Sequence, residues 1–337
     1  MLVVMKSDAT PAQIEAVADR ISQLGYTPHV IPGALRTAIG ITGNRGPEGR
    51  DALSVLSGVA DVIRVTSAYK LVSRETHPEP SAFPVANTRI GKGFTLIGGP
   101  CSVENEAMLL NTAEFMTKRG VKLLRGGAYK PRTSPYAFQG LGEEGLRILA
   151  KAKEQTGIGI VTEVMDTESL PAIVEVADVI QIGTRNMQNY PLLRRLAEVD
   201  KPMLLKRGMA ATLEEWLMAA EYLVSGGNRR VILCERGVRT FADQTRNTLD
   251  LSAIPVVKHL SHLPIIIDPS HGTGKAAYVP SMCLAALAAG ADGLLIEVHP
   301  DPSQALSDGA QSLTFDAFTK MQESLRPIAT ALNVEIL

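Results

Sequence analysis

The sequence lacks the features that mark secreted, membrane-bound or disulfide-stabilised proteins. Only three cysteines occur in 337 residues, Cys101, Cys234 and Cys283, and no two of them form a CxxC pair. An odd, low number of this kind argues against a disulfide framework and fits a reducing compartment. No apolar run is long enough to span a membrane, and the start, MLVVMKSDAT, has no basic region followed by a long apolar stretch. We therefore expect no signal peptide, no membrane partner and a cytoplasmic location.

An excess of charge of one sign is also missing. The 34 Lys and Arg residues nearly balance the 35 Asp and Glu residues, which leaves a net charge of −1. Without a basic field over the whole protein, nucleic acid is not an expected partner, and any bound anion must be held by local positive charge. A hydrophobic fraction of 45% and a charged fraction of 20% are ordinary for a globular protein, and the length is enough for one large domain or for a large and a small one.

Residues 1–67 predict a small α+β domain. Thr10 as N-cap, Pro11 in the first turn, Gln13 at the capping-box position and Gly25 as a stop signal delimit a first helix. A second helix is expected at 49–59, and strands are expected at 2–5, 27–31, 37–43 and 60–66. The order β-α-β-β-α-β is that of a ferredoxin-like unit. Proline and polar residues then dominate residues 68–92, which we interpret as a linker that ends in a short hairpin.

Residues 93–337 alternate apolar strand-like runs with amphipathic helical stretches. Eight strands are expected, at 94–102, 121–129, 157–165, 179–186, 202–208, 229–237, 264–272 and 293–300. Continuous Val, Ile and Leu runs are typical of parallel strands that are buried on both faces. Eight such repeats in this length predict a (β/α)8 TIM barrel. A doubly wound open sheet is the competing architecture, but no strand is followed by the GxGxxG turn that such folds often carry.

Ionisable side chains stand at the expected carboxyl ends of these strands, where barrel enzymes place their catalytic groups. One such residue alone most often belongs to a structural ion pair. A structural explanation is less plausible when every strand places an ionisable residue at the same rim of the barrel. Five are cationic: Arg125, Lys130, Arg185, Lys206 and Arg236. Cations that are crowded together repel one another unless an anion joins them, and arginine matches the geometry of phosphate and carboxylate. The rim therefore predicts a ligand with several negative charges, or two such ligands.

A second group at the same rim could hold a metal. Cys101, His271 and Glu297 follow or end strands, and Asp308 stands in the later stretch ALSDGAQS. A Cys, His and carboxylate set suits Mn²⁺, Fe²⁺, Co²⁺ or Zn²⁺, although the spacing is not that of a zinc finger. Cys234 and Cys283 are interpreted as small buried hydrophobic residues. The stretch SHGTGKA is not a P-loop, because proline replaces the first glycine and alanine follows the lysine.

Long motifs in the second part are familiar: GPCSVE, LRGGAYKPRTSPYAFQGLG, QIGTRNMQN, LLKRG, ILCERG, DPSHGTG, IEVHP and ALSDGAQSL. They closely resemble 3-deoxy-D-arabino-heptulosonate 7-phosphate (DAHP) synthase, the enzyme family that opens the shikimate pathway. The similarity covers essentially the whole chain and is to the subtype with an N-terminal ferredoxin-like domain. It implies a metal-dependent transferase that condenses phosphoenolpyruvate with erythrose 4-phosphate and releases phosphate.

The resemblance also implies roles for residues of this sequence. The metal ligands fall on Cys101, His271, Glu297 and Asp308, and the phosphoenolpyruvate-binding cations on Arg125, Lys130, Arg185, Lys206 and Arg236. Arg132, Thr133 and Ser134 of the KPRTS loop should face erythrose 4-phosphate. Glu163 is a candidate for positioning or deprotonating water, Lys130 for protonating the alkoxide, and His271 also belongs to the catalytic set.

Regulation and assembly are expected on the same basis. Related enzymes are inhibited by an aromatic amino acid through the small domain, so tyrosine or phenylalanine is the expected effector and His29 a candidate contact. A homotetramer is expected from the family. Two alternatives stay open: 3-deoxy-D-manno-octulosonate 8-phosphate synthase, whose loop resembles KANRSS where this chain has KPRTS, and a non-catalytic barrel that senses a sugar phosphate.

Overall fold

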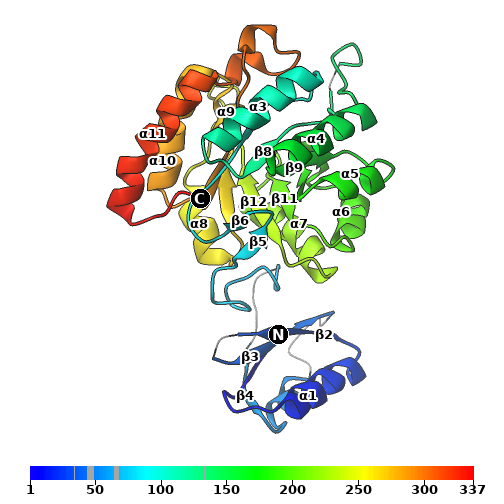
Figure 1. Cartoon of the computed structure of the whole chain (residues 1–337). Coiled ribbons are helices and arrows are strands. Elements are labelled where there is room, and N and C mark those ends of the chain that lie inside the picture. Colours follow the sequence, from blue (N-terminus) through cyan, green and yellow to red (C-terminus); the bar gives the residue numbers. More distant parts are fainter. Residues whose placement is uncertain (34, 44–48, 64–67, 133) are drawn as a thin grey trace. The chain divides into compact units, whose positions relative to one another are not determined.

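The structure is a computed structural model that describes residues 1–33, 35–43, 49–63, 68–132 and 134–337 (Figure 1). It divides into two compact units. One comprises Met1–Pro80 with Leu260–His262, and the other comprises Ser81–His259 with Leu263–Leu337. Each unit is described by itself.

The first unit is an antiparallel sheet of four strands in the order β2-β3-β1-β4, with two helices. Its elements are β1 (Leu2–Met5), α1 (Pro11–Gln23), β2 (Thr27–Pro32), β3 (Thr37–Thr42), α2 (Arg50–Ser54) and β4 (Val59–Ile63). Thr10 and Gln13 form the predicted capping box at the start of α1. Val17 and Ile21 of α1 pack with Val3, Ile39 and Ile41 of the sheet in one apolar core. The predicted ferredoxin-like fold is confirmed.

The second helix of this unit is shorter than predicted. It ends at Ser54, whereas the pattern of apolar residues predicted a helix to residue 59. Gly58 adopts a φ of +86°, a conformation that reverses the chain direction and leads directly into β4 at Val59. Helical spacing of Leu53 and Leu56 misled the prediction, since both residues face the same core from a helix and a turn respectively. The expected end of β4 lies outside the described residues.

The second unit is a closed barrel of eight parallel strands, as predicted. Neighbouring strands follow the order β10-β11-β12-β13-β14-β7-β8-β9, so that the first strand of the barrel pairs with the last. The strands are β7 (Thr95–Gly99), β8 (Leu123–Arg125), β9 (Gly159–Val164), β10 (Val179–Ile182), β11 (Met203–Lys206), β12 (Val231–Glu235), β13 (Ile265–Ile267) and β14 (Gly293–Glu297).

Helices surround these strands in Figure 1. They are α3 (Glu106–Lys118), α4 (Glu143–Thr156), α5 (Leu170–Val176), α6 (Tyr190–Ala197), α7 (Leu213–Ser225), α8 (Ala253–Leu260), α10 (Val279–Ala288) and α11 (Phe315–Leu332). Short helical turns occupy the loops at η1 (Thr184–Asn186), α9 (Pro269–Thr273), η2 (Ala276–Tyr278), η3 (Pro302–Gln304) and η4 (Gly309–Gln311). Among the described residues, no helix has the length and apolar character that crossing a bilayer requires.

Apolar side chains fill the interior of the barrel away from the strand ends that carry charge. A small hairpin, β5 (Phe83–Val85) with β6 (Thr88–Ile90), contributes Phe83, Val85 and Ile90 to this filling. They belong to one buried cluster with barrel residues such as Leu204 and Ile266. Cys234 lies in the same cluster, and burial raises the pKa of its thiol, as expected of an inert cysteine. Among the described residues, this apolar filling leaves the carboxyl ends of the strands as the polar end of the barrel interior.

Helix α7 carries the only tryptophan of the chain and a capping box at its start. The Thr212 hydroxyl accepts a hydrogen bond from the Glu215 amide at 3.1 Å, and the Glu215 carboxylate accepts one from the Thr212 amide at 2.8 Å. Trp216, one turn into the helix, is fully buried and donates its indole N–H to the Leu205 carbonyl of β11 at 3.1 Å. Its fluorescence should therefore report on the packing of α7 against the barrel.

Replacing the cap residue, Thr212→Ala, should lower the free energy of unfolding by about 1 kcal/mol, because an orphan amide of the first turn loses its acceptor. Urea titration followed by Trp216 fluorescence measures the change. Thr212→Ser keeps the hydroxyl and serves as the control. Equal stability of the alanine and serine variants would show that the cap contributes nothing.

Candidate active site

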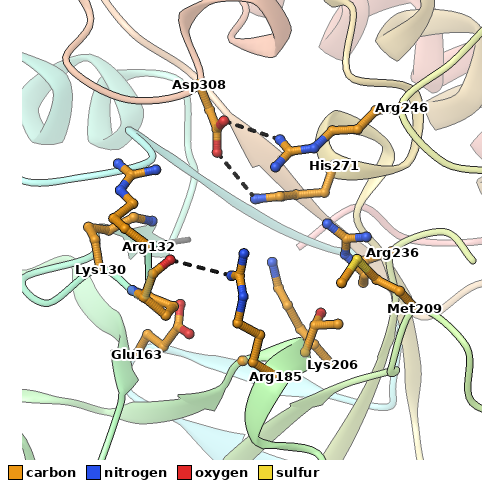
Figure 2. A pocket seen from close by; sticks show the side chains of 13 residues that line it. Lys130, Arg132, Glu163, Arg185, Lys206, Met209, Arg236, Arg246, His271 and Asp308 are labelled. Atoms are coloured by element: carbon orange, nitrogen blue, oxygen red, sulfur yellow. Dashed lines mark hydrogen bonds and ion pairs between the residues drawn. The ribbon is translucent and has the colours of Figure 1, made fainter. Parts of the chain in front are cut away.

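Side chains from the ends of several strands surround one cavity of about 220 Å³ (Figure 2). Described residues that line it are Lys130, Pro131, Arg132, Glu163, Gly183, Thr184, Arg185, Lys206, Met209, Arg236, Arg246, His271 and Asp308. Six of these are lysine or arginine and two are acidic, so the lining carries a clear excess of positive charge. The cavity is thus suited to a ligand with several negative charges.

Buried cations at this site hold hydrogen-bond donors without acceptors. Arg236 is 5% exposed, and its Nε and Nη1 atoms find no hydrogen-bond partner among the described residues. Arg125 lies behind the cavity lining and is 3% exposed; its Nε atom has no hydrogen bond among the described residues, whereas its Nη1 atom forms an ion pair with Glu297 Oε1 at 3.1 Å. Leaving buried donors unsatisfied is costly, and an anion that accepts from them removes the cost. The Arg236 guanidinium group, which lines the cavity, therefore points to an anionic ligand.

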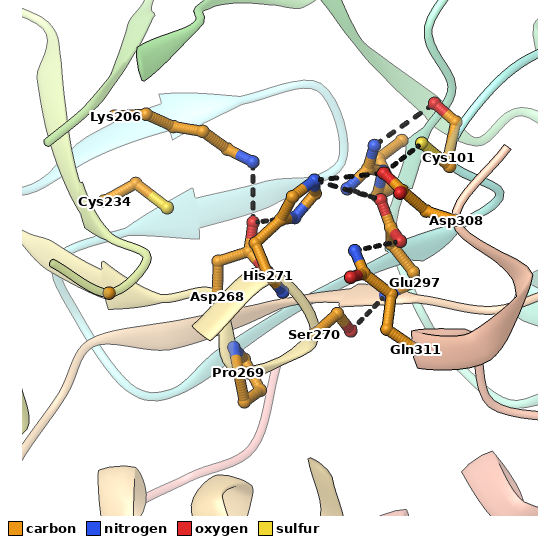
Figure 3. Close-up of polar contacts among 12 residues, drawn as sticks. Cys101, Lys206, Cys234, Asp268, Pro269, Ser270, His271, Glu297, Asp308 and Gln311 are labelled. Carbon is orange, nitrogen blue, oxygen red and sulfur yellow. Dashed lines mark hydrogen bonds and ion pairs between the residues drawn. The ribbon is translucent and has the colours of Figure 1, made fainter. Parts of the chain in front are cut away.

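Asp268 connects the cationic side of the site to the metal-binding candidates (Figure 3). Its Oδ2 atom accepts from Lys206 Nζ at 2.6 Å and lies 2.7 Å from His271 Nδ1, and its Oδ1 atom accepts from the His271 amide at 2.9 Å. Burial alone would raise the pKa of Asp268, but Lys206 and His271 hold it well below its usual value. A charged Asp268 fixes the His271 proton on Nδ1, so the Nε2 lone pair is available as a ligand.

The free nitrogen of His271 faces two carboxylates. Its Nε2 atom lies 3.4 Å from Glu297 Oε1 and 3.7 Å from Asp308 Oδ2. Burial lowers the pKa of His271, so the neutral imidazole that metal coordination needs is favoured. Glu297 Oε2 accepts from Gln311 Nε2 at 2.7 Å, whereas Oε1 is buried and has no hydrogen bond, although Arg125 Nη1 lies 3.1 Å away.

Cys101 completes this group from the loop after β7. Its Sγ atom lies 3.3 Å from Asp308 Oδ2, 3.0 Å from Ser307 Oγ and 3.1 Å from Lys130 Nζ. Burial, with the nearby charge of Glu297, raises the pKa of the thiol to about 12. Asp308, in contrast, has its pKa lowered to about 2, because His271 and Arg246 outweigh the effect of burial.

These donor atoms fit a divalent metal ion. Ligand atoms of Cys101, Glu297 and Asp308 all lie within 4.8 Å of one another, and His271 Nε2 is within 3.7 Å of both carboxylates. Donors that share one ion at about 2.0–2.3 Å are themselves roughly 3–4 Å apart. The Glu297 Oε1 atom, which has no hydrogen bond and pairs only electrostatically with Arg125, lies 3.4 Å from His271 Nε2 here. The structure thus brings together all four residues that the sequence suggested as metal ligands.

Glu163 reaches the cavity from the end region of β9. Its Oε2 atom accepts from Gln181 Nε2 at 2.9 Å. Gly183 gives the carboxylate its space, because a Cβ atom at position 183 would come within 2.0 Å of Glu163 Oε1. This close approach explains why the motif QIGTRN has glycine immediately after the strand.

The KPRTS loop is brought to the cavity only in part. Arg132 lines it, donates from Nε to the Phe138 carbonyl at 2.9 Å and hydrogen-bonds Ser307. Ser134 is exposed, does not line the cavity, and accepts from the Tyr136 amide at 3.3 Å. Thr133 lies outside the described residues. Arg185 also lines the cavity and donates to the Pro131 carbonyl of this loop at 3.3 Å.

Two residues of the site were not singled out from the sequence. Arg246 lines the cavity and donates to Asp308 Oδ1 at 3.1 Å, and Gln311 orients Glu297. Both stand in loops well beyond the strand ends, so inspecting strand ends could not find them. His29, the regulatory candidate, lies in β2 of the first unit, where its Nε2 atom is 2.8 Å from Thr42 Oγ1.

Comparisons with known proteins follow the same division of the chain. The DAHP synthetase I family matches residues 79–333, and the DAHP synthase ferredoxin-like domain matches residues 1–67. A phospho-2-dehydro-3-deoxyheptonate aldolase of Thermotoga maritima is 48% identical over 337 residues, which cover 100% of this chain and 100% of that protein. A 2-dehydro-3-deoxyphosphooctonate aldolase of Syntrophotalea carbinolica is 34% identical over 269 residues, covering 74% of this chain and 96% of that protein.

Solved structures agree with these relationships. The crystal structure of the Thermotoga maritima phospho-2-dehydro-3-deoxyheptonate aldolase (DAHP synthase) aligns with a TM-score of 0.80 over 100% of this chain and 99% of that chain. A truncated form of the 3-deoxy-D-arabino-heptulosonate 7-phosphate synthase from Thermotoga maritima aligns with a TM-score of 0.75 over 79% of this chain and 98% of that chain. By its matched profiles and its identity to a relative of the same length, the chain belongs to the DAHP synthetase I family.

Proposed function

We infer that this chain catalyses the condensation of phosphoenolpyruvate with D-erythrose 4-phosphate and water to give DAHP and phosphate. The observation that carries this inference is a cation-lined cavity that adjoins a Cys, His, Glu and Asp donor set in a chain of the DAHP synthetase I family. The reaction belongs to the shikimate pathway and to aromatic amino acid biosynthesis. Roles of individual residues, the metal and the regulation are proposals that rest on this function.

Phosphoenolpyruvate is proposed to bind on the side of the cavity that Lys206, Arg236 and Arg185 line. Its carboxylate and phosphate supply acceptors for the unsatisfied donors of Arg236, and Arg125 extends this positive surface behind the lining. Lys206 is held by Asp268 at 2.6 Å, so its ammonium group is presented to the ligand in one position. A fixed set of charged donors orients the enol carbon of the substrate toward the second site.

Erythrose 4-phosphate is proposed to lie on the KPRTS side, with its phosphate at Arg132. The Arg132 guanidinium is anchored to the Phe138 carbonyl at 2.9 Å and faces the same cavity as Asp308. Ser134 and Thr133 are retained as candidate contacts to this phosphate. Arg246, which lines the cavity beside Asp308, adds positive charge on this side.

The metal ion is proposed to be held by Cys101, His271, Glu297 and Asp308, with Mn²⁺, Fe²⁺, Co²⁺ or Zn²⁺ as candidates. When bound, such an ion supplies a Lewis acid beside the aldehyde of erythrose 4-phosphate. Soft sulfur and hard oxygen donors in one set favour a transition metal over Mg²⁺ or Ca²⁺. Asp268 supports the set, because it fixes the orientation of His271.

Protein groups are also proposed to move the protons of the reaction. The enol carbon of phosphoenolpyruvate attacks the aldehyde carbon, and the aldehyde oxygen takes up a proton, for which Lys130 is the candidate donor. Water then adds to C2 of the resulting cation, and Glu163 is placed to orient that water or accept its proton. Expulsion of phosphate from the tetrahedral centre completes the reaction. Lys130 and Glu163 both line the cavity, which supports these roles.

The two alternative functions, octulosonate phosphate synthesis and sugar-phosphate sensing, differ from the proposed one in relatives and in the residues that they require. Relatives named 2-dehydro-3-deoxyphosphooctonate aldolase match 64–76% of this chain at 31–34% identity, whereas the DAHP relative matches all of it at 48%. A sugar-phosphate sensor needs an anion site and has no use for the four-residue donor set. Phosphate release with erythrose 4-phosphate, and none with arabinose 5-phosphate or without a sugar, tests the function against both alternatives.

Division of the cavity between the substrates predicts opposite kinetic effects of two arginine variants. Arg132→Ala should raise KM for erythrose 4-phosphate by roughly 10- to 150-fold, because loss of one charged contact to a phosphate costs about 1.5–3 kcal/mol. Arg185→Ala should raise KM for phosphoenolpyruvate instead. Steady-state kinetics with each substrate varied in turn give both values. Arg195→Ala, on the exposed part of α6, is the control. Equal effects on both substrates from both variants would contradict this division.

Metal removal should abolish turnover, and Mn²⁺ or another divalent ion should restore it. Because the Cys101 thiol has a pKa of about 12 without metal, coordination must displace its proton. Metal affinity should therefore rise as pH rises, by about tenfold per pH unit from this group alone, throughout the range below that pKa. Titration of the chelator-treated protein at several pH values measures the slope.

His271→Ala should lose metal and turnover together while the barrel stays folded. Cys101→Ser should weaken soft metals most, because a hydroxyl is a poor substitute for a thiolate. Elemental analysis of the stripped protein is the control for residual metal. Full turnover of protein shown to contain no metal would remove the metal from the proposal.

The small domain is proposed to carry feedback inhibition by tyrosine or phenylalanine, in a homotetramer. Support comes from the family match over residues 1–67, and His29 is kept as a candidate contact although it already lies against Thr42. Deleting residues 1–67 should leave turnover and remove the inhibition, as initial rates at increasing amino acid concentration will show. Unchanged inhibition of the shortened chain would place the effector on the barrel.

A further inference from the structure

Asp308, a proposed metal ligand, stands in a long loop instead of at a strand end. The loop runs from the end of β14 to α11 and contains two short helical turns, η3 and η4. Asp308 itself adopts a φ of +52°, which is unusual for a residue other than glycine. A ligand in such a position needs contacts that hold its backbone in place.

One buried carboxylate holds the middle of this loop. Glu104 follows Cys101 by three residues, and its side chain is 6% exposed. Its Oε1 atom accepts a hydrogen bond from the Leu306 amide at 2.9 Å. Leu306 itself is 55% exposed, so its side chain contributes little to anchoring this part of the loop.

The same carboxylate faces the start of the loop. His299 Nδ1 accepts from the Asp301 amide at 3.0 Å, so any proton on the ring must be carried by Nε2. His299 Nε2 is buried, has no hydrogen bond among the described residues, and lies 3.5 Å from Glu104 Oε2. The His299 amide in turn donates to the Leu313 carbonyl at 2.9 Å, at the far end of the loop.

We propose that Glu104 and His299 form a positioning pair that sets the metal affinity of the site by fixing the Asp308 loop against the segment that carries Cys101. Neither residue is a ligand. The segment 101–104 both supplies the thiol and, through Glu104, holds the loop that brings Asp308 Oδ2 to 3.3 Å and Ser307 Oγ to 3.0 Å from Cys101 Sγ. The inference rests on the proposed metal site and adds residues to it that no strand-end argument identifies.

A pair with a purely structural role would make similar contacts, but its loss would lower stability without changing metal affinity. Asp292 offers the comparison: its Oδ1 atom accepts from Lys258 Nζ at 2.8 Å and its Oδ2 atom from the Ile265 amide at 2.8 Å, at the opposite ends of the strands. Like Glu104, it joins a cationic or polar side chain to a backbone amide. Asp292→Asn should therefore lower stability and leave metal binding unchanged.

The test measures Mn²⁺ binding to the full-length, chelator-treated protein, with free Mn²⁺ counted by electron paramagnetic resonance. Glu104→Gln keeps the side-chain volume but has one acceptor oxygen for two neighbours, and His299→Phe keeps a ring without a donor. Each should raise the Kd for Mn²⁺ by roughly 10- to 100-fold, the usual effect of losing support behind a metal ligand. The Kd for Mn²⁺ of the double variant should not exceed the higher of the two single-variant values, because the two residues act together.

The Kd values distinguish failure of the proposed metal site from failure of the proposed positioning pair. Absence of Mn²⁺ binding to the unmodified protein would remove the metal site itself. Binding to the unmodified protein, with an unchanged Kd in Glu104→Gln and in His299→Phe, would overturn the positioning pair. A rise of Kd in Asp292→Asn equal to theirs would do the same, since it would reflect general destabilisation. Trp216 fluorescence checks that each variant is folded. If His299→Phe does not fold, the Kd of Glu104→Gln alone decides whether the pair sets the metal affinity.

Discussion

The buried charge of Asp268 is the interaction on which the rest of the site depends. One carboxylate, fully enclosed by protein, accepts from Lys206 and fixes His271 through both its side chain and its backbone. A buried charge without partners is strongly unfavourable, so Lys206 and His271 are held where Asp268 requires them. Lys206 lines the cationic cavity and His271 belongs to the proposed metal set, so Asp268 fixes the position of the one relative to the other.

Barrel topology explains why these halves meet. Strand β14 pairs with both β7 and β13, so segments that are far apart in sequence, such as those carrying Cys101 and Glu297, end side by side. Apolar packing by the hairpin β5–β6 fills the other end of the barrel interior. The charged side chains that line the cavity lie at the carboxyl ends of the strands, where burial strengthens each interaction. Loops can then vary without disturbing the frame that holds the strand-end residues.

Features that depend on regular periodicity and strand order could be predicted from the sequence. Both folds, all eight barrel strands and the convergence of Cys101, His271 and Glu297 follow from apolar runs and from barrel closure, whereas the loop that carries Asp308 does not. The end of α2 could not be predicted, because Leu53 and Leu56 keep helical spacing while Gly58 turns the chain. Arg246 and Glu104 were missed because their roles depend on loop conformations and tertiary contacts that no local pattern encodes.

The balance of charge relates the proposed metal set to the cationic lining of the cavity. The proposed metal set, with an ionised thiol and two carboxylates at Cys101, Glu297 and Asp308, would carry three negative charges. A divalent ion would offset two of them, and three cations lie 3.1 Å from the set: Arg125 at Glu297, Lys130 at Cys101 and Arg246 at Asp308. The proposed set would then have no negative excess, and the cationic excess of the cavity lining would remain for the two phosphates and the carboxylate of the substrates. Because like charges in a small cavity repel, binding of those anions should stabilise the lining, and we expect substrate affinity to arise from the same residues that are proposed to orient the reacting carbons.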